Sequence, residues 1–133
     1  MEIIGVGTDI VECLRIARMI ERHGEQFLRR IYTEREIRTC NTNKRTTESF
    51  AGRWAAKEAI LKALGGSDGR NIAWTEIEVR RAGANGRPQV MLGGAIRELA
   101  RGLRVADIYL SVAHCRAYAT AYALAVRETP KSQ

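Results

Sequence analysis

The pattern of hydrophobic and polar positions predicts a strand at the start of the chain and helices after it. Residues 2–11 alternate with a period of two, which is typical of a strand with two unlike faces. Between about residues 12 and 23 the hydrophobic positions recur at helical spacing, and a short segment follows at residues 27–31. The capping box "TERE" at residues 33–36 opens another short helix.

A longer helix is predicted after the polar loop at residues 41–46. Thr46 or Thr47 is expected to cap this helix, and Gly65 with Gly66 to end it. The order of elements lacks a regular βαβ alternation, so it favours an α+β domain with a largely antiparallel sheet packed with helices. The predicted elements of the second half are a strand near residues 74–81, a hairpin signal at Asn85-Gly86 leading into residues 89–92, an amphipathic helix at residues 93–103, and two strands at residues 108–112 and 118–126 joined near residues 114–117.

The composition is that of one globular domain. The chain has 133 residues, enough for a single hydrophobic core but too few for two. We expect one domain over residues 1–127 and a disordered tail over residues 128–133. No apolar run approaches the roughly 20 residues of a membrane span, and the N-terminus lacks the features of a signal peptide, so we expect a cytoplasmic protein. The three cysteines have no metal-ligand spacing and are expected to be free thiols.

The chain is strongly basic, with a formal net charge of +7 and a pI near 9.8. This charge predicts an anionic partner, which can be a nucleic acid, an acidic protein or a phosphorylated small molecule. On the first predicted helix, Arg15, Arg18 and Arg22 lie within a narrow arc opposite the apolar side. Two interpretations stay open: an ordinary solvated helix face, or a ridge that docks an acidic protein helix or a nucleic acid backbone.

On the first strand, Gly5, Gly7 and Asp9 share one face. One interpretation is a site for a hard cation or a phosphate, whose ligand approaches the backbone closely where side chains are missing. The other is that the glycines mark a bulge and that Asp9 ends the strand. Taken alone, the pattern favours the second interpretation.

The stretch "RWAAKEAILKALGG" places Lys57, Glu58 and Lys62 in an otherwise apolar helix. Glu58 and Lys62 can form a solvated i, i+4 ion pair, which would add only about 0.3–0.5 kcal/mol. Both residues nevertheless border the side that must face the sheet, where a carboxylate is costly without a compensating cation. Asp9 and Glu58 together would give one Mg²⁺ two carboxylates, and Lys62 would neutralise phosphate oxygens. We therefore interpret these charges as a metal–phosphate site.

These motifs occur together in one known family. The stretches "IGVGTDIVECLRI", "FAGRWAAKEAILKALGG", "TEIEV", "NGRPQV" and "LSVAHCRAYATA" follow one another over about residues 3–126. In this order they resemble the holo-acyl-carrier-protein synthases, the small-type 4′-phosphopantetheinyl transferases. The pairing of G-x-G-x-D with W-A-A-K-E-A-x-x-K is specific, whereas either motif alone would be weak.

The resemblance implies a fold and an activity. It implies the 4′-phosphopantetheinyl transferase-like fold and transfer of phosphopantetheine from coenzyme A to a serine of apo-acyl carrier protein, which releases adenosine 3′,5′-bisphosphate. It also implies Mg²⁺ as the metal, fatty acid biosynthesis as the pathway served, and a homotrimer with active sites between subunits. The partners expected are an acidic acyl carrier protein and coenzyme A, with neither nucleic acid nor membrane.

The resemblance also assigns residues. It places the metal-binding and catalytic carboxylates on Asp9 and Glu58, and the catalytic lysine on Lys62. Glu58 could accept the serine proton directly or through a water molecule, and the water route is favoured. The remaining assignments are coenzyme A binding by Arg53, Lys62, Gly65 and His114, and carrier-protein docking by Arg15, Arg18 and Arg22.

The chain departs from the family's sequence pattern at one position, and one alternative function stays open. Many members read S-x-S-H where this chain has Ser111-Val112-Ala113-His114, so a ligand contact by a hydroxyl at position 113 is missing. His114 is either close to the nucleotide or a turn histidine bonded to backbone groups. The rival function is a small basic nucleic-acid-binding module without catalysis, supported by net charge and the arginine ridge but by no nucleic-acid motif.

Overall fold

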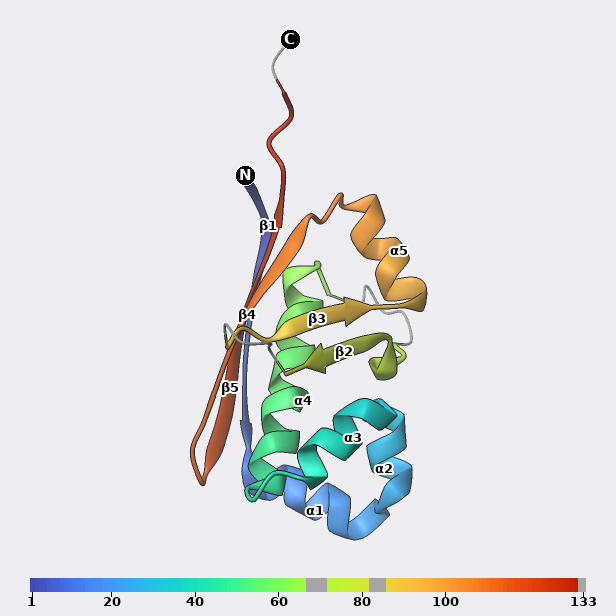
Figure 1. Cartoon of the computed structure of the whole chain (residues 1–133), viewed down its shortest axis with the longest axis vertical. Helices are drawn as coiled ribbons and strands as arrows, with labels where there is room; N and C mark the ends of the chain where they lie inside the picture. The colour runs from blue at the N-terminus through green and yellow to red at the C-terminus, as the bar shows by residue number, and fades with distance from the viewer. Residues whose placement is uncertain (67–71, 82–85, 132–133) are drawn as a thin grey trace.

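The computed structural model describes residues 1–66, 72–81 and 86–131, and Figure 1 shows the arrangement of their elements. Strands β1, β5 and β4 form an antiparallel sheet in that order, and β2 and β3 form a separate antiparallel pair. The described elements are β1 (Glu2–Glu12), α1 (Cys13–His23), α2 (Glu25–Ile31), α3 (Glu34–Asn41), α4 (Thr46–Ala63), the 3-10 helix η1 (Trp74–Glu76), β2 (Ile77–Arg80), β3 (Gln89–Leu92), α5 (Gly94–Gly102), β4 (Asp107–His114) and β5 (Tyr118–Arg127).

Helix α4 runs along one face of the three-stranded sheet, with α1, α2 and α3 at one end of the molecule and α5 at the other (Figure 1). Strand β5 presents small side chains to this helix, because Ala119, Ala121, Ala123 and Ala125 are buried and alternate with exposed residues. Helices and antiparallel sheets are thus combined without βαβ units, which confirms the α+β fold class. The division into a domain of residues 1–127 and a tail of residues 128–133 stays a prediction.

The two glycines of β1 have a structural role that differs from both sequence interpretations. A Cβ atom on Gly7 would overlap the carbonyl oxygen of Ala59, and one on Gly5 would overlap that of Ala63. The space beside these glycines is therefore filled by the backbone of α4 and cannot admit a ligand. A register shift does lie just before Gly5, but Asp9 lies inside the strand and does not end it.

The helix boundaries follow the sequence prediction in most places. Thr33 caps α3 in a complete capping box with Glu36, and the amide of Gly66 donates to the carbonyl of Leu61 at the end of α4. The predicted cap of α4 is wrong, because the N-cap residue is Arg45 and Thr46 is already helical.

The first predicted strand of the second half and the three cysteines can also be compared with the sequence prediction. The strand predicted near residues 74–81 begins with the short η1 helix, and Asn85 of the hairpin signal lies outside the described residues. Cys13, Cys40 and Cys115 are free thiols, as predicted. Among the described helices, each is too short or too polar to cross a bilayer.

Candidate active site

Asp9 and Lys62 meet at the edge of the sheet formed by β1. The Nζ atom of Lys62 lies 3.3 Å from Oδ1 of Asp9 and donates to the carbonyl of Thr8 at 3.0 Å. The Asp9 side chain is 17% exposed and that of Lys62 is 53% exposed, so the pair faces solvent from a sheltered position. The close fit of β1 against α4 fixes this geometry, because Gly7 brings the strand against the helix at Ala59.

Glu58 lies one helical turn before Lys62 and is half-buried. Burial raises the pKa of Glu58 above its ordinary value, and the negative charge of Asp9 raises it further, while Lys62 and Arg15 lower it. Lys62, which contacts Asp9, lies one helical turn from Glu58, so the two carboxylates lie in one region. The sequence prediction that Asp9, Glu58 and Lys62 converge is therefore consistent with their placement.

The chemistry of this donor set fits a single Mg²⁺. Mg²⁺ commonly takes one or two protein carboxylates and fills its other positions with water and substrate phosphates. Asp9 and Glu58 supply two carboxylates whose mutual repulsion a cation would relieve. Among the described residues there is no cluster of three or more His, Cys, Asp or Glu side chains that could hold a metal by themselves. Besides the two carboxylates, a metal here would thus need oxygen atoms from water or a substrate.

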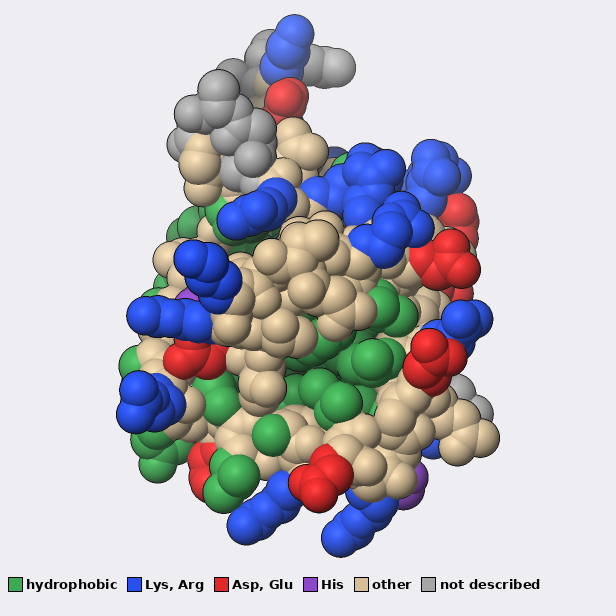
Figure 2. Space-filling model, turned by 60° about the horizontal axis from the view of Figure 1, so that its bottom comes forward, with side chains coloured by type: hydrophobic (Ala, Val, Ile, Leu, Met, Phe, Trp, Pro, Cys, Tyr) green, Lys and Arg blue, Asp and Glu red, His purple; other side chains and the backbone are tan. Residues whose placement is uncertain are grey.

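Helix α1 carries the arginine ridge beside this site. Arg15, Arg18 and Arg22 are all exposed, while Cys13 and Ile16 on the other side are buried. The guanidinium of Arg15 lies 5.9 Å from the centre of the Trp54 ring, within cation–π range. On the face that Figure 2 shows, Lys and Arg side chains, interspersed with Asp and Glu, border a partly exposed hydrophobic area. Arg15 therefore belongs to the ridge and also acts on the carboxylate site, since its charge lowers the pKa of Glu58.

Arg53 and His114 line a different cavity, of about 410 Å³, between α4, the β2–β3 pair and the end of β4. Arg53 donates through Nη1 to Oγ of Ser49 at 3.1 Å. Its buried Nε atom has no hydrogen-bond partner among the described residues. A buried guanidinium N–H without a partner is costly and favours binding of an anion.

Glu48 is a polar residue that the sequence reasoning missed. Its Oε2 atom lies 3.7 Å from Nδ1 of His114 and 3.7 Å from Nε of Arg45. The same oxygen is buried and accepts no hydrogen bond from a described residue. Glu48 therefore faces the imidazole of His114 from the start of α4, which no spacing within the sequence indicated.

The carboxylate site and the Arg53 cavity do not meet within one chain. Asp9 lies on β1 and His114 on β4, which are the two edge strands of the sheet, and α4 covers the strand between them. Arg53 and Lys62 are nine positions apart on α4, which at about 100° per residue places them on opposite sides of the helix. Gly65 stands just beyond Lys62 at the end of α4, with a φ of +97°.

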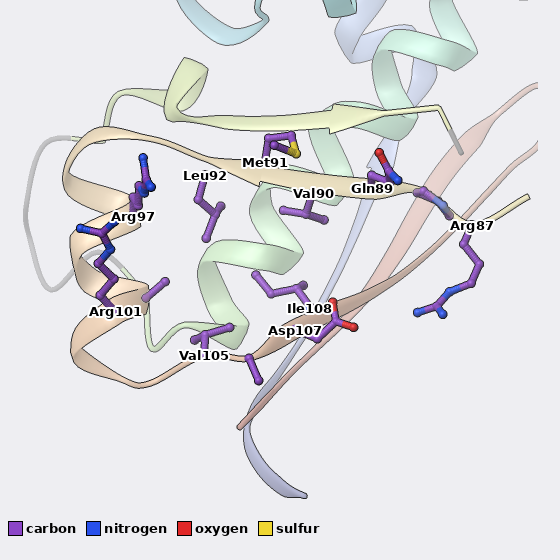
Figure 3. Close-up of a pocket in the computed structure, with 13 residues that line it drawn as sticks. Arg87, Gln89, Val90, Met91, Leu92, Arg97, Arg101, Val105, Asp107 and Ile108 are labelled. Carbon is purple, nitrogen blue, oxygen red and sulfur yellow. Dashed lines mark hydrogen bonds between the residues drawn. The ribbon is translucent and has the colours of Figure 1, made fainter. Parts of the chain in front are cut away.

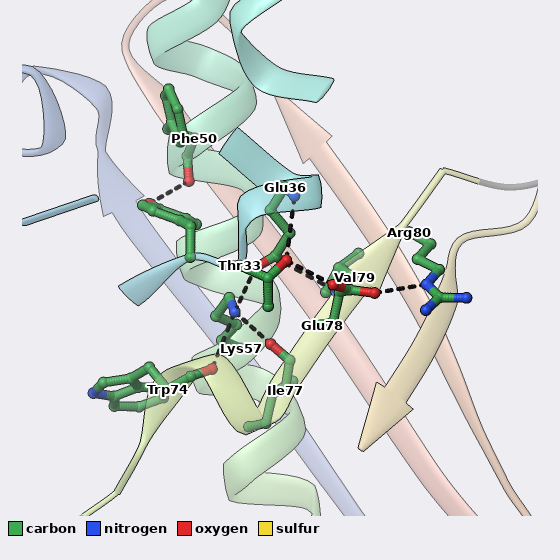
Figure 4. Close-up of polar contacts among 10 residues, drawn as sticks. Thr33, Glu36, Phe50, Lys57, Trp74, Ile77, Glu78, Val79 and Arg80 are labelled. Carbon is green, nitrogen blue, oxygen red and sulfur yellow. Dashed lines mark hydrogen bonds and ion pairs between the residues drawn. The ribbon is translucent and has the colours of Figure 1, made fainter. Parts of the chain in front are cut away.

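Lys57 corrects the sequence interpretation of the charged helix. Its side chain is 1% exposed and its Nζ lies 2.7 Å from Oε1 of Glu36, which is fully buried. Lys57 also donates to the carbonyl of Trp74 at 3.1 Å and to that of Ile77 (Figure 4). Oε2 of Glu36 accepts the amide of Val79 at 2.9 Å. Lys57 thus joins α4 to α3 and to β2, and it is not part of the metal–phosphate site.

The comparisons with known proteins agree with this architecture. A family model of the 4′-phosphopantetheinyl transferase superfamily matches residues 5–125. A holo-[acyl-carrier-protein] synthase from Rhodopirellula baltica is 44% identical over 122 residues, which cover 92% of this chain and 96% of that protein.

Two solved structures are similar over almost the whole chain. The crystal structure of a holo-[acyl-carrier-protein] synthase from Neisseria meningitidis has a TM-score of 0.83 and 29% identity, covering 94% of this chain and 99% of that chain. A holo-(acyl-carrier-protein) synthase from Bacillus anthracis, in complex with CoA (3′,5′-ADP), has a TM-score of 0.76 and 32% identity, covering 96% of this chain and 100% of that chain.

The chain belongs to the 4′-phosphopantetheinyl transferase superfamily, in the group of small enzymes that includes the holo-[acyl-carrier-protein] synthases. It is therefore an enzyme, a phosphopantetheinyl transferase, as the sequence resemblance indicated. This membership replaces the alternative of a nucleic-acid-binding module without catalysis.

Proposed function

We propose that this protein transfers the 4′-phosphopantetheine group of coenzyme A to a serine of apo-acyl carrier protein, giving holo-acyl carrier protein and adenosine 3′,5′-bisphosphate. The main support is the convergence of Asp9, Glu58 and Lys62 at one edge of the sheet. The complex of the Bacillus anthracis relative with CoA (3′,5′-ADP) supports coenzyme A as the donor. On the same resemblance, the product serves fatty acid biosynthesis in the cytoplasm, a reducing compartment to which the free thiols are suited.

In this proposal Mg²⁺ is held by the carboxylates of Asp9 and Glu58. When bound, it would neutralise the diphosphate of coenzyme A and the charge that develops on the leaving group. Lys62 lies beside Asp9 and adds a second positive charge for the phosphate oxygens. Gly65, at the end of the same helix, leaves the backbone accessible next to Lys62.

The reaction forms a bond between the carrier serine Oγ and the β-phosphorus, and it breaks the bond from that phosphorus to the oxygen bridging to the α-phosphate. The serine proton needs an acceptor as the bond forms. Glu58 is the carboxylate that we assign as the acceptor, because it is half-buried beside Asp9 and one helical turn from Lys62. It takes the proton directly or through a water molecule, and Lys62 stabilises the anionic leaving group.

A homotrimer would complete the site. The face of the sheet away from α4 carries exposed hydrophobic side chains, which mark an interface when they gather in one patch. A neighbouring copy could then bring its Arg53 cavity to the carboxylates of the first, with Arg53 and His114 near the nucleotide phosphates. The exposed side chains of this face include Val6, Ile10, Tyr109, Tyr118 and Tyr122.

The arginine ridge of α1 would dock the carrier protein. Acyl carrier proteins are expected to be acidic, and Arg15, Arg18 and Arg22 present positive charge beside the carboxylate site. Such a ridge steers the encounter and orients the serine, whereas its effect on final affinity is smaller.

Position 113 lies on an exposed part of the sheet, because Ala113 pairs with Thr120 and both residues are exposed. The hydroxyl that many family members carry at this position would therefore lie on the sheet surface.

The proposal is tested by incubating the purified protein with apo-acyl carrier protein, coenzyme A and Mg²⁺. Intact-mass spectrometry should show the carrier gaining one phosphopantetheine, with adenosine 3′,5′-bisphosphate appearing in equal amount. Addition of EDTA should stop the reaction, and excess Mg²⁺ should restore it. A carrier whose mass does not change under these conditions would overturn the proposed function, and activity that survives EDTA would overturn the metal assignment alone.

A further inference from the structure

A second large cavity lies apart from both halves of the active site. It is an open cavity with a volume of about 580 Å³, bordered by β3, α5 and the start of β4 (Figure 3). None of the residues assigned to metal, coenzyme A or carrier protein lines it, and Pro88 is the one described residue that it shares with the Arg53 cavity. Its size falls within the range of about 300–1,000 Å³ that is usual for small-molecule sites.

The floor of this cavity is aliphatic. Val90 and Leu92 of β3 face Val105 and Ile108 across it (Figure 3). Ile108 is 9% exposed and belongs to the hydrophobic core, so the floor is a continuation of the packed interior. Among the described residues that line the cavity there is no aromatic ring on which a base or a ring ligand could stack. The surface therefore suits an extended aliphatic body.

Positive charge is concentrated at one end. Arg97 and Arg101 are one turn apart on α5 and lie together at that end of the cavity in Figure 3. Arg101 Nη1 contacts Oε1 of Glu98 at 3.2 Å in an exposed pair, which stabilises by little. Arg97 has no side-chain ion pair or hydrogen bond with any described residue. Two guanidinium groups are therefore available to an anion at the end of the aliphatic floor.

The other charged groups of the cavity lie away from this end. Arg87 is held over the ring of Tyr109, with its Cζ 4.9 Å from the ring centre. Asp107 is distant from Arg97 and Arg101 in Figure 3, and its Oδ1 accepts the amide of Ile108 at 2.8 Å. The single carboxylate of the lining thus does not neutralise the α5 arginines.

We propose that this cavity, which we call the α5 cavity, binds an amphipathic anion with an unbranched aliphatic body and a terminal carboxylate. The body would lie on Val90, Leu92 and Val105, and the carboxylate would bind the guanidinium groups of Arg97 and Arg101. Arginine suits this role because its planar N–H groups match a carboxylate in pairs. The proposal is independent of the transferase reaction, since no reacting group lines the cavity.

The test uses sodium decanoate as the probe, with calorimetry or NMR titration of the full chain below the micelle concentration. We expect one decanoate to bind per chain. Acetate lacks the aliphatic body and 1-decanol lacks the charge. Each should therefore bind at least about tenfold more weakly than decanoate. Shifts in NMR signals should concentrate on β3, α5 and the start of β4.

Arg97→Gln with Arg101→Gln should weaken decanoate binding about tenfold. The matched control is Arg29→Gln with Arg30→Gln, which removes the same charge from exposed positions on α2 and should leave the affinity unchanged. Failure of decanoate to bind, equal binding of 1-decanol or acetate, or equal loss in the two double variants would each overturn the proposal. Both double variants concern exposed side chains, so circular dichroism should show the native fold for each.

Discussion

On the proposed function, Glu58 is a residue at which stability and activity conflict. Its carboxylate is half-buried next to Asp9, and both circumstances raise its pKa. For an acid whose pKa is higher in the folded than in the unfolded state, ionisation costs folding free energy. That cost is absent below the unfolded pKa and reaches its full value as the pH rises through the folded pKa.

Replacing this carboxylate with a neutral amide should therefore stabilise the metal-free protein. We expect Glu58→Gln to raise Tm at neutral pH by about 1–3 °C and to lower kcat/KM about 10³-fold, because a metal ligand is lost. The difference in Tm should shrink as the pH is lowered through the raised pKa of Glu58. Thermal scans between neutral and acidic pH test this, with Glu21→Gln on the exposed side of α1 as the control. A Tm difference independent of pH would contradict the electrostatic explanation.

The buried pair of Lys57 and Glu36 gives a second prediction for single residues. Lys57→Met would leave the carboxylate of Glu36 buried without its cation, so it should lower the free energy of unfolding by about 3–5 kcal/mol. Adding Glu36→Gln should recover part of this loss, because the amide is neutral and its oxygen can still accept the amide of Val79, while the amide of Thr33 loses its acceptor. Urea unfolding of both variants measures the difference. A double variant no more stable than Lys57→Met would show that the charge of Glu36 is not the cause.

These residues show what the sequence could and could not predict about the site. Helical spacing predicts that Glu58 and Lys62 lie on the same side of their helix. Their proximity to Asp9 is predicted because a carboxylate beside the sheet needs a compensating cation. Lys57 lies in the same helical segment, yet its partner Glu36 is 21 positions away in a different helix. A pair between elements depends on how the helices pack, which no periodicity within one element contains. The sequence pattern therefore groups Lys57 with the wrong charges.

At the scale of elements, the sequence predicts well which segments form helices and strands. It predicts less well how closely these elements pack against one another. The capping box and the terminal glycines are local signals, and they predicted the start of α3 and the end of α4 correctly. The role of Gly5 and Gly7 cannot be predicted from such local signals. A glycine in a strand can make room for a ligand, mark a bulge or allow a neighbouring backbone to approach. Contact with α4 decided among these, and it is a property of two elements together.

Helix α1 supports a prediction that separates docking from catalysis. We expect Arg18→Glu with Arg22→Glu to raise KM for the carrier protein about tenfold or more, while KM for coenzyme A stays unchanged. The effect should weaken at high salt, because exposed charges are screened. Steady-state kinetics at two ionic strengths measure both constants. Arg97→Glu with Arg101→Glu on α5 is the control with the same net charge, and an equal rise in KM there would assign the effect to charge alone.

Arg15 should behave differently from its two neighbours on the ridge. It contacts Trp54 and lowers the pKa of Glu58, so Arg15→Glu should raise that pKa as well as weaken docking. The acidic limb of the kcat profile should then move to higher pH, which Arg18→Glu with Arg22→Glu should not cause. A pH profile unchanged by Arg15→Glu would mean that this arginine acts in docking only.

At the scale of the whole molecule, the two groups of residues in the proposed active site lie at opposite edges of the sheet. The carboxylates of Asp9 and Glu58 lie beside β1, whereas Arg53 and His114 lie beside β4. The sheet face away from α4 carries large hydrophobic side chains at 37–67% exposure, such as Tyr109 and Ile10. Both observations are explained together if this face is the contact between copies, in a closed ring where each copy gives a different half-site to each neighbour.

The ring makes a prediction that a monomeric enzyme does not. Glu58→Gln and Arg53→Ala should each be nearly inactive alone, but co-expressed chains should regain activity, because a site with both half-sites intact forms wherever the right neighbours meet. For random mixing, about one quarter of the sites should be intact, so activity should approach that fraction of the wild-type value. Introducing Tyr122→Glu into both chains should abolish the recovery by placing a charge in the contact, and sedimentation should then show monomers. Mixed chains without recovered activity would mean that each copy completes its own site, which would require Arg53 to reach around α4, the helix that carries it.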